Sequence, residues 1–151
     1  MGTKTRQDAR EAFAAILDAA KSSSDVKAVY NYFKGHLKGE SPVVMVTSGS
    51  MTRSRAGQGT KKYEVLTGLN VIIAVQDANQ SAGGLTEKEA DDLVDAIEKW
   101  IADVVSDNQS GTEWDLLHYK GNASEPLPGK DLDGNPYIIE IIQLEALAYD
   151  E

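Results

Sequence analysis

The side chains that acid-base and nucleophilic chemistry usually need are scarce in this sequence. It has no cysteine and two histidines, His36 in a polar turn and His118 in a stretch that also carries Trp114. A catalytic group needs partners that converge on it and shift its pKa. Neither histidine lies in a motif that supplies a partner at a fixed spacing. We therefore expect both histidines to be structural or exposed, and we predict no catalytic residues and no enzyme.

Two stretches carry the residue types of a metal or phosphate site but lack the required spacing. In "GKDLDGNPY", Asp131, Asp133 and Asn135 alternate. A calcium-binding EF-hand loop needs Gly at its sixth position and Glu at its twelfth, where this chain has Pro136 and Ile142. "AGQGTKK" has glycines like a phosphate loop, but it precedes a strand and lacks the Gly-Lys-Ser/Thr of a Walker A motif. We predict neither a metal site nor a cofactor.

Residues 52 to 62 form a basic arm in an acidic chain, whose formal net charge is -9. The four cations of the arm are Arg53, Arg55, Lys61 and Lys62. The surrounding sequence predicts a polar connection of about 13 residues, from residue 48 to residue 60, and loops of that length in compact domains are usually functional or disordered. A solvated hairpin tip is the simpler interpretation, and a contact with a neighbouring subunit is the functional one.

The second predicted helix carries acids that complement the arm. These acids are Asp91, Asp92, Asp95 and Glu98. If the arm of one copy met this face on a neighbour, the contact would set orientation and encounter rate more than net affinity. A solvated helix face is the alternative for each acid taken singly.

Hydrophobic periodicity and turn residues predict an α+β fold. Apolar positions at helical spacing indicate a helix over residues 5 to 21 and another from residue 86, where Thr86 and Glu89 form a capping box. Alternation and β-branched residues indicate strands at 26 to 33, 43 to 48, 63 to 76, 112 to 119 and 137 to 149. Helix stays open as an alternative for the first of these, and a long connection is expected over 120 to 136. We predict one domain over residues 1 to 151, with a mainly antiparallel sheet of about four to five strands, helices packed on one face and a long β-hairpin arm.

The composition of the chain restricts the classes of partner that it is expected to bind. Broad nucleic-acid binding needs a clustered positive face, and only the arm is locally basic in this acidic chain. No apolar run approaches the roughly 20 residues of a membrane span. The opening "MGTKTRQDAR" is charged and no apolar segment of a signal peptide follows it. We therefore expect no membrane partner and a protein that is made and used in the cytoplasm.

The order of these elements resembles the tail terminator proteins of long-tailed bacteriophages, the lambda-type tail-tube capping proteins. The resemblance is carried by a "GESPVVMV" strand entered through Pro42, a long hairpin, an "LNVIIAV" strand, a capped helix, a Trp-containing strand and the closing "PYIIEIIQLEALAY". It covers residues 7 to 149 and rests on the order of the elements and on the local residue patterns quoted above.

The resemblance implies a non-enzymatic virion protein that assembles into a ring, generally of six copies. Such a ring caps the tail tube, ends its polymerisation and offers a surface for joining the head. The implied partners are further copies of the chain, the tail tube protein and the head-tail connector protein, with DNA passing through the ring without specific binding. The resemblance also implies that residues 52 to 62 lie at a subunit interface or face the lumen. The implied location is the host cytoplasm during assembly and then the tail or neck of the virion.

Two other functions stay open. A head-completion or neck adaptor protein would share the small α+β fold and the tendency to form oligomers. A small binding module could instead grip DNA or another polyanion with the basic loop at 52 to 62, which would make its affinity depend strongly on salt.

Overall fold

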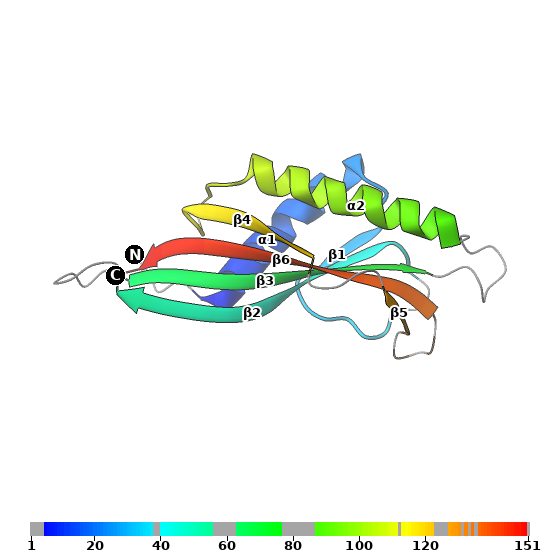
Figure 1. Cartoon of the computed structure of the whole chain (residues 1–151), viewed down its shortest axis with the longest axis horizontal. Helices are drawn as coiled ribbons and strands as arrows, with labels where there is room; N and C mark the ends of the chain where they lie inside the picture. The colour runs from blue at the N-terminus through cyan, green and yellow to red at the C-terminus, as the bar shows by residue number, and fades with distance from the viewer. Residues whose placement is uncertain are drawn as a thin grey trace.

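The computed structural model describes residues 5–37, 40–55, 63–76, 87–111, 113–122, 127–130, 132, 134 and 136–150. Two helices lie on the same side of one β-sheet (Figure 1). In chain order the elements are α1 (Arg6–Ala20), the short 3-10 helix η1 (Lys21–Ser23), β1 (Ala28–Tyr30), β2 (Val43–Arg55), β3 (Tyr63–Gln76), α2 (Glu87–Asp107), β4 (Leu116–Asn122), β5 (Leu127–Lys130) and β6 (Pro136–Asp150). The predicted α+β class with helices on one face of the sheet is confirmed.

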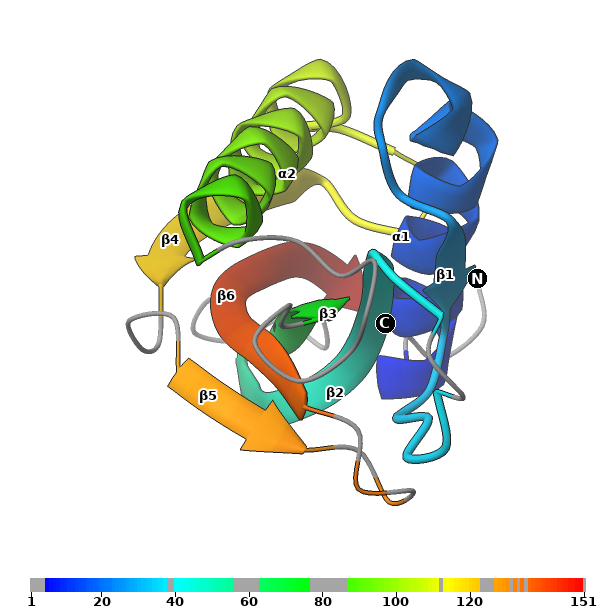
Figure 2. The same ribbon diagram turned by 90° about the vertical axis from the view of Figure 1, so that its right-hand side faces the viewer.

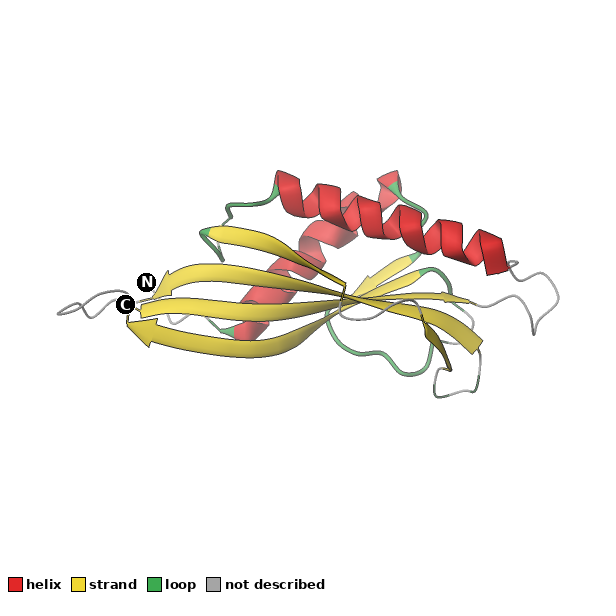
Figure 3. Ribbon diagram, in the orientation of Figure 1, coloured by secondary structure: helices red, strands yellow, loops and turns green. Residues whose placement is uncertain are grey.

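The sheet is mixed but mostly antiparallel. Its strand order is β1-β2-β3-β6-β4, and β5 pairs with the first residues of β6. The pair of β1 with β2 is parallel, and the other four described pairs are antiparallel. Strands β2, β3 and β6 are 13, 14 and 15 residues long, so the central ribbon reaches roughly 45 Å at about 3.4 Å per residue. The two long edges of the sheet are therefore formed by β1 and β2 on one side and by β4 and β5 on the other (Figure 3).

The main core lies between the sheet and the helices. Phe13 and Leu17 bring the apolar stripe of α1 to the sheet, and Ile97 and Ile101 do the same for α2. Alternate residues of β3 face them and are buried, namely Val65, Thr67, Leu69, Val71, Ile73 and Val75. Each fully buried side chain of this size contributes about 1.5–3 kcal/mol by leaving water. This layer holds both helices on one side of the sheet, which we call the helix side.

The opposite face, which we call the open face, has no helix among the described residues (Figure 3). At one end it carries a smaller apolar cluster, formed by Leu37, Val43, Met45, Ile72, Ala74 and Tyr137. The hydroxyl of Tyr137 donates to the carbonyl oxygen of Glu40 at 2.9 Å. That bond ties the segment before β2 to β6. The start of β6 is apolar on both of its faces because one face contacts this cluster and the other contacts the main core.

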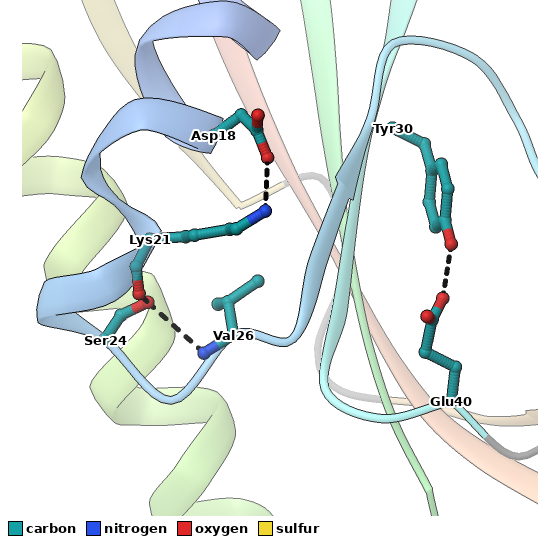
Figure 4. Close-up of polar contacts among 6 residues, drawn as sticks. All are labelled: Asp18, Lys21, Ser24, Val26, Tyr30 and Glu40. Atoms are coloured by element: carbon teal, nitrogen blue, oxygen red, sulfur yellow. Dashed lines mark hydrogen bonds and ion pairs between the residues drawn. The ribbon is translucent and has the colours of Figure 1, made fainter.

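Local side chains set where α1 begins and how the chain leaves it. The Thr5 hydroxyl caps the helix and accepts a hydrogen bond from the Asp8 amide at 3.1 Å. After η1, the Ser24 hydroxyl accepts from the Val26 amide at 3.2 Å (Figure 4). This turn carries the chain directly into β1. Helix α1 lies along the β1 and β2 edge of the sheet, whereas α2 lies over β3, β6 and β4 (Figure 2).

Four predicted boundaries differ from the structure. The strand predicted at 43 to 48 continues to Arg55. Within residues 26 to 33, Ala28–Tyr30 form a strand, because these are the residues that pair with β2. The strand predicted at 112 to 119 begins later and is Leu116–Asn122. The long connection predicted over 120 to 136 contains β5, which pairs with β6. All described strands belong to one sheet, and the single domain over the whole chain stays a prediction.

Candidate interaction surfaces

Strand β2 contains the two arginines of the basic arm. Arg53 and Arg55 are exposed, and their Cα partners on β3 are Val65 and Tyr63. The prediction of a polar loop is therefore wrong for residues 48 to 55, and residues 56 to 60 lie outside the described residues. The ladder continues here because interstrand hydrogen bonds join main-chain groups and do not require apolar side chains. The arginines are held on a strand, and Lys61 and Lys62 lie outside the described residues.

A β-bulge in the middle of β2 decides which way these arginines point. Ser48 pairs with the buried Leu69, and the register then shifts so that Met51 pairs with the buried Thr67. Without the shift, even-numbered residues would continue on the helix side. With it, Arg53 and Arg55 share the helix side.

Helix α1 carries two more arginines, one of which contacts the middle of β2. Arg10 reaches β2, where its Nη1 donates to the Ser48 hydroxyl at 3.3 Å. Arg6 lies one turn earlier on the same side of the helix and is exposed. We call Arg6, Arg10, Arg53 and Arg55 the basic edge. The sequence signal for the two helical members, which was missed, is a pair of arginines at i and i+4 that extends the apolar stripe of Ala9 and Phe13.

The predicted acids on α2 do not form one surface. Asp91, Asp92 and Asp95 are exposed, whereas Glu98 is partly buried. Asp91, Asp95 and Glu98 follow one another at i, i+4 and i+7 and share a flank of the helix. Asp92 points about 100° away from Asp91, because successive helical residues turn by that angle.

Glu98 is engaged within its own chain. Its Oε1 accepts a hydrogen bond from the Tyr119 hydroxyl at 3.3 Å. Burial, and then the negative charge and hydrogen bond of Glu98, raise the pKa of Tyr119 to about 12. This contact fixes α2 to β4, so Glu98 has a structural role.

The two described arginines of the arm and the first acids of α2 lie at opposite ends of the molecule. Helix α2 begins at the right-hand end of Figure 1, whereas β2 ends at the left-hand end. Asp91 and Asp95 belong to the first turns of α2, and Arg53 and Arg55 to the last residues of β2. The pairing of these residues between copies stays a prediction, and it would require a neighbour displaced along the long axis.

The open face carries an apolar groove at the end opposite the basic edge. Its volume is about 150 Å³, and its lining includes Phe33, Leu37, Met45 and Leu132. Phe33 is 65% exposed and Leu132 70% exposed, so the rim presents large apolar side chains to solvent. At its edge Lys34 lies 4.4 Å from the ring centroid of Tyr30.

Tyr30 ties the rim of this groove to the segment before β2. Its hydroxyl donates to Glu40 in a short hydrogen bond (Figure 4) and accepts from Lys34 Nζ at 3.0 Å. The bond to Glu40 is the largest cause of a raised pKa for Tyr30. Tyr30 therefore hydrogen-bonds to both Glu40 and Lys34. The groove itself keeps an apolar lining that is exposed at its rim.

No converging set of catalytic groups accompanies these surfaces in the described part of the chain. His36 and His118 are both exposed, and no three His, Cys, Asp or Glu side chains gather as a metal site among the described residues. The aspartates of "GKDLDGNPY" lie outside those residues. No described helix is both long and apolar enough to span a bilayer.

Comparison with known proteins does not assign the chain to a family. No protein-family model matches the sequence, and a search of curated proteins finds no significant match.

Proposed function

We propose that this chain is a structural assembly protein of a bacteriophage virion, which forms a ring that caps the tail tube, ends tube polymerisation and provides the surface for joining the head. The element order supports the proposal, because it resembles that of tail terminator proteins. By the same resemblance the ring has six copies and the protein is not an enzyme.

The observation that supports the proposal most is that the two long edges of the sheet present different surfaces. Arg10 contacts β2, and Arg53 and Arg55 lie on it, whereas the opposite edge is β4, whose Tyr119 bonds to Glu98 of α2. A ring is built from heterologous contacts, in which a patch on one subunit meets a different patch on the next. An elongated protein with unlike edges can repeat such a contact and close.

The partners follow from this arrangement. If the edges join copies of the chain, the ends of the molecule and the open face remain for the tail tube protein and the head-tail connector protein. The groove lined by Phe33 and Leu132 is the most apolar exposed feature there. DNA would pass through the ring without specific contacts. The protein would act in the host cytoplasm during assembly and then in the tail or neck of the virion.

Assembly of the purified chain tests the proposal. Light scattering coupled to size exclusion, over a range of protein and salt concentrations, is expected to give one discrete oligomer that electron microscopy shows as a ring with a central hole. Added to purified tail tubes, the rings are expected at one end of each tube. Open-ended filaments, or rings that bind head connectors but never tubes, would contradict the capping role, and the second result would favour a head-completion or neck adaptor protein.

The second candidate is a polyanion-binding module that uses the basic loop at 52 to 62. The grouping of Arg53 and Arg55 on the helix side of β2, with Arg10 contacting Ser48 of the same strand, favours it, since phosphate binding needs grouped cations. DNA retention measured against salt concentration separates the two functions. Binding that weakens steeply with salt and becomes less salt-dependent in Arg53→Ala/Arg55→Ala would support the module.

A further inference from the structure

Three leucines form a row across the open face, at the end of the sheet opposite the apolar groove. Leu66 on β3 pairs with Leu147 on β6, and Leu147 pairs with Leu116 on β4. All three face away from the helix side, because Leu66 alternates with the buried Val65 and Thr67. Directly opposite residues have Cβ atoms about 4.5–5.5 Å apart, so the leucine side chains lie against one another. Leu116 is 45% exposed, and we call Leu66, Leu116 and Leu147 the leucine row.

The apolar groove is the second apolar patch of the open face. Ile141 on β6 is part of its lining, and the segment from Leu147 to Ile141 spans roughly 20 Å at about 3.4 Å per residue. On the rim of the groove, the Leu132 amide donates to the Gly35 carbonyl at 2.8 Å, which holds the exposed Leu132 side chain beside Phe33. Contiguous apolar patches that face solvent mark interaction sites.

A polar hollow separates the two apolar patches. Its volume is about 180 Å³, and Leu66 of the leucine row belongs to its lining. The bulge in β2 sets Gly49 against Gly68, where a Cβ on Gly49 would lie 3.1 Å from the Gly68 carbonyl oxygen, so no side chain fills the floor. The walls carry hydroxyl, amide and charged groups, namely Ser50, Thr52, Asn70, Gln143, Lys120 and Glu145.

The charged groups of the hollow form one ion pair. Lys120 Nζ lies 3.7 Å from Glu145 Oε2, and the two side chains are 50% and 33% exposed. An ammonium has three donors and a carboxylate has about four acceptor sites, so one contact leaves both groups able to bind further partners. The hollow therefore presents a positive and a negative charge side by side to any surface that covers it.

The order of these features along β6 makes the open face self-complementary. Gln143 and Glu145 flank the midpoint between Leu147 and Ile141. A two-fold axis through this midpoint, perpendicular to the face, would bring the leucine row of each copy over the groove of the other. It would also bring each ion pair over a reversed ion pair. An isologous contact requires such self-complementarity, because the same patch is used on both subunits.

We infer that two copies of this chain pair through their open faces about such an axis, with their strands antiparallel. Lys120 of each copy then meets Glu145 of the other. The leucine row of each copy packs against the groove of the other, between Phe33 and Leu132.

The size of the open face sets the strength of the pairing. From Leu66 to Ala74 the face is roughly 27 Å long, and four strands make it roughly 19 Å wide. Each copy would then bury about 500 Å², and the pair about 1,000 Å² in total, which is the lower limit for a specific interface. Reversible pairing follows, with a Kd that dilution of the protein can reach.

This pairing goes beyond the proposed ring and does not depend on it. The ring would use the edges of the sheet, whereas the pairing uses the open face, so the two contacts are separate. The open face is also the surface proposed for the tail tube protein. Paired copies would therefore have to separate before that protein could bind there.

Charge reversal tests the centre of the interface. Lys120→Glu and Glu145→Lys each place like charges together, and each variant alone is expected to raise the Kd of pairing at least about tenfold. Mixed in equal amounts, the two variants are expected to recover pairing, measured by sedimentation equilibrium. Rescue between chains cannot come from the ion pair within a chain, because neither variant has one. Failure of this rescue, while circular dichroism shows both variants folded, would overturn the inference.

Truncation tests the two apolar ends. Leu116→Ala removes the most exposed member of the leucine row, and Leu132→Ala removes one wall of the groove. Each is expected to weaken pairing at least about tenfold, because the contact occurs twice in every pair. Tyr32→Ala is the matched control, since Tyr32 is 51% exposed but lies between α1 and β1. Equal losses in all three variants would contradict the assigned surfaces.

A crosslink tests the symmetry. The chain has no cysteine, so Gln143→Cys places one thiol beside the axis, where packed sheets lie about 10 Å apart. A bis-maleimide of about that length is expected to join two Gln143→Cys chains. It is not expected to join two Leu116→Cys chains, whose thiols would lie roughly 20 Å apart. Equal crosslinking of both, or a wild-type chain that never pairs at about 1 mM, would overturn the inference. Rings that form without face pairing would leave the capping proposal standing, whereas pairs without rings would do the opposite.

Discussion

The two halves of strand β2 pair with the same neighbour but contribute to the molecule in different ways. Val43, Val44, Met45 and Val46 are all buried, whereas Thr52, Arg53, Ser54 and Arg55 are all exposed. Both halves keep the ladder with β3. The comparison shows that backbone pairing can hold a strand whose side chains are exposed to solvent. The first half stabilises the fold, and the second half carries a charged surface on a rigid support.

A charge placed in the buried half should have the largest effect. Val44 is fully buried between the sheet and the helices. Val44→Asp would therefore bury a carboxylate with no partner, and it is expected to lower the free energy of unfolding by more than about 4 kcal/mol. The same replacement in the exposed half, Thr52→Asp, is expected to stay within about 0.5 kcal/mol. Urea denaturation followed by circular dichroism measures both. Equal losses would show that the two halves do not differ in this way.

Truncation of apolar side chains extends the comparison to the two faces of the sheet. Leu17 is fully buried on the helix side, and Leu17→Ala is expected to cost about 2–5 kcal/mol. Leu132 is 70% exposed on the open face, and Leu132→Ala is expected to change stability by less than about 0.5 kcal/mol. Thermal and urea unfolding of the two variants test this. A large loss for Leu132→Ala would mean that the groove supports the fold and is not held open for a partner.

Titration of Tyr119 probes the contact that ties α2 to β4. Its pKa is raised from 10.0 to about 12, first by burial and then by Glu98. The folded state therefore keeps the phenol proton that the unfolded chain loses, and stability should fall as pH rises from about 10 to about 12. Glu98→Gln should lower the Tyr119 pKa but leave it above 10, because burial remains. Ultraviolet absorbance of the phenolate measures this. A Tyr119 pKa of 10 in the wild-type chain would contradict the buried contact.

The smallest effect on folding is expected from the arginines of the exposed half. Arg53→Ala/Arg55→Ala should change the free energy of unfolding by less than about 0.5 kcal/mol. The same variant should weaken self-association, most clearly at low salt, because the Debye length shortens as salt is added. Denaturation of dilute protein and light scattering of concentrated protein separate the two quantities. Destabilisation without any change in association would assign these arginines to the fold.

Much of the fold could be predicted because its signals are local. Alternation over residues 63 to 76 matches the bounds of β3, and the helical spacing over residues 5 to 21 agrees with α1, which is Arg6–Ala20. The polar half of β2 could not be predicted in the same way. Its residues show no apolar alternation, and its strand conformation comes from pairing with β3.

The candidate surfaces were predicted only in part. The composition of residues 52 to 62 singled out Arg53 and Arg55, which lie on one surface. It did not indicate Arg10, which joins them because α1 packs along β2 and reaches Ser48. Nor did it indicate the leucine row, whose members lie on three different strands.

The sequence by itself determined the helices, the strands β3 and β6 and the buried side of β3, because side-chain periods of 3.6 and 2.0 are properties of neighbouring residues. Only the tertiary structure decided where the charges lie. A bulge after Ser48 turns Arg53 and Arg55 to the helix side, and the pairing of β4 with β6 brings Lys120 beside Glu145. Both depend on contacts between residues far apart in the chain, which no local pattern records.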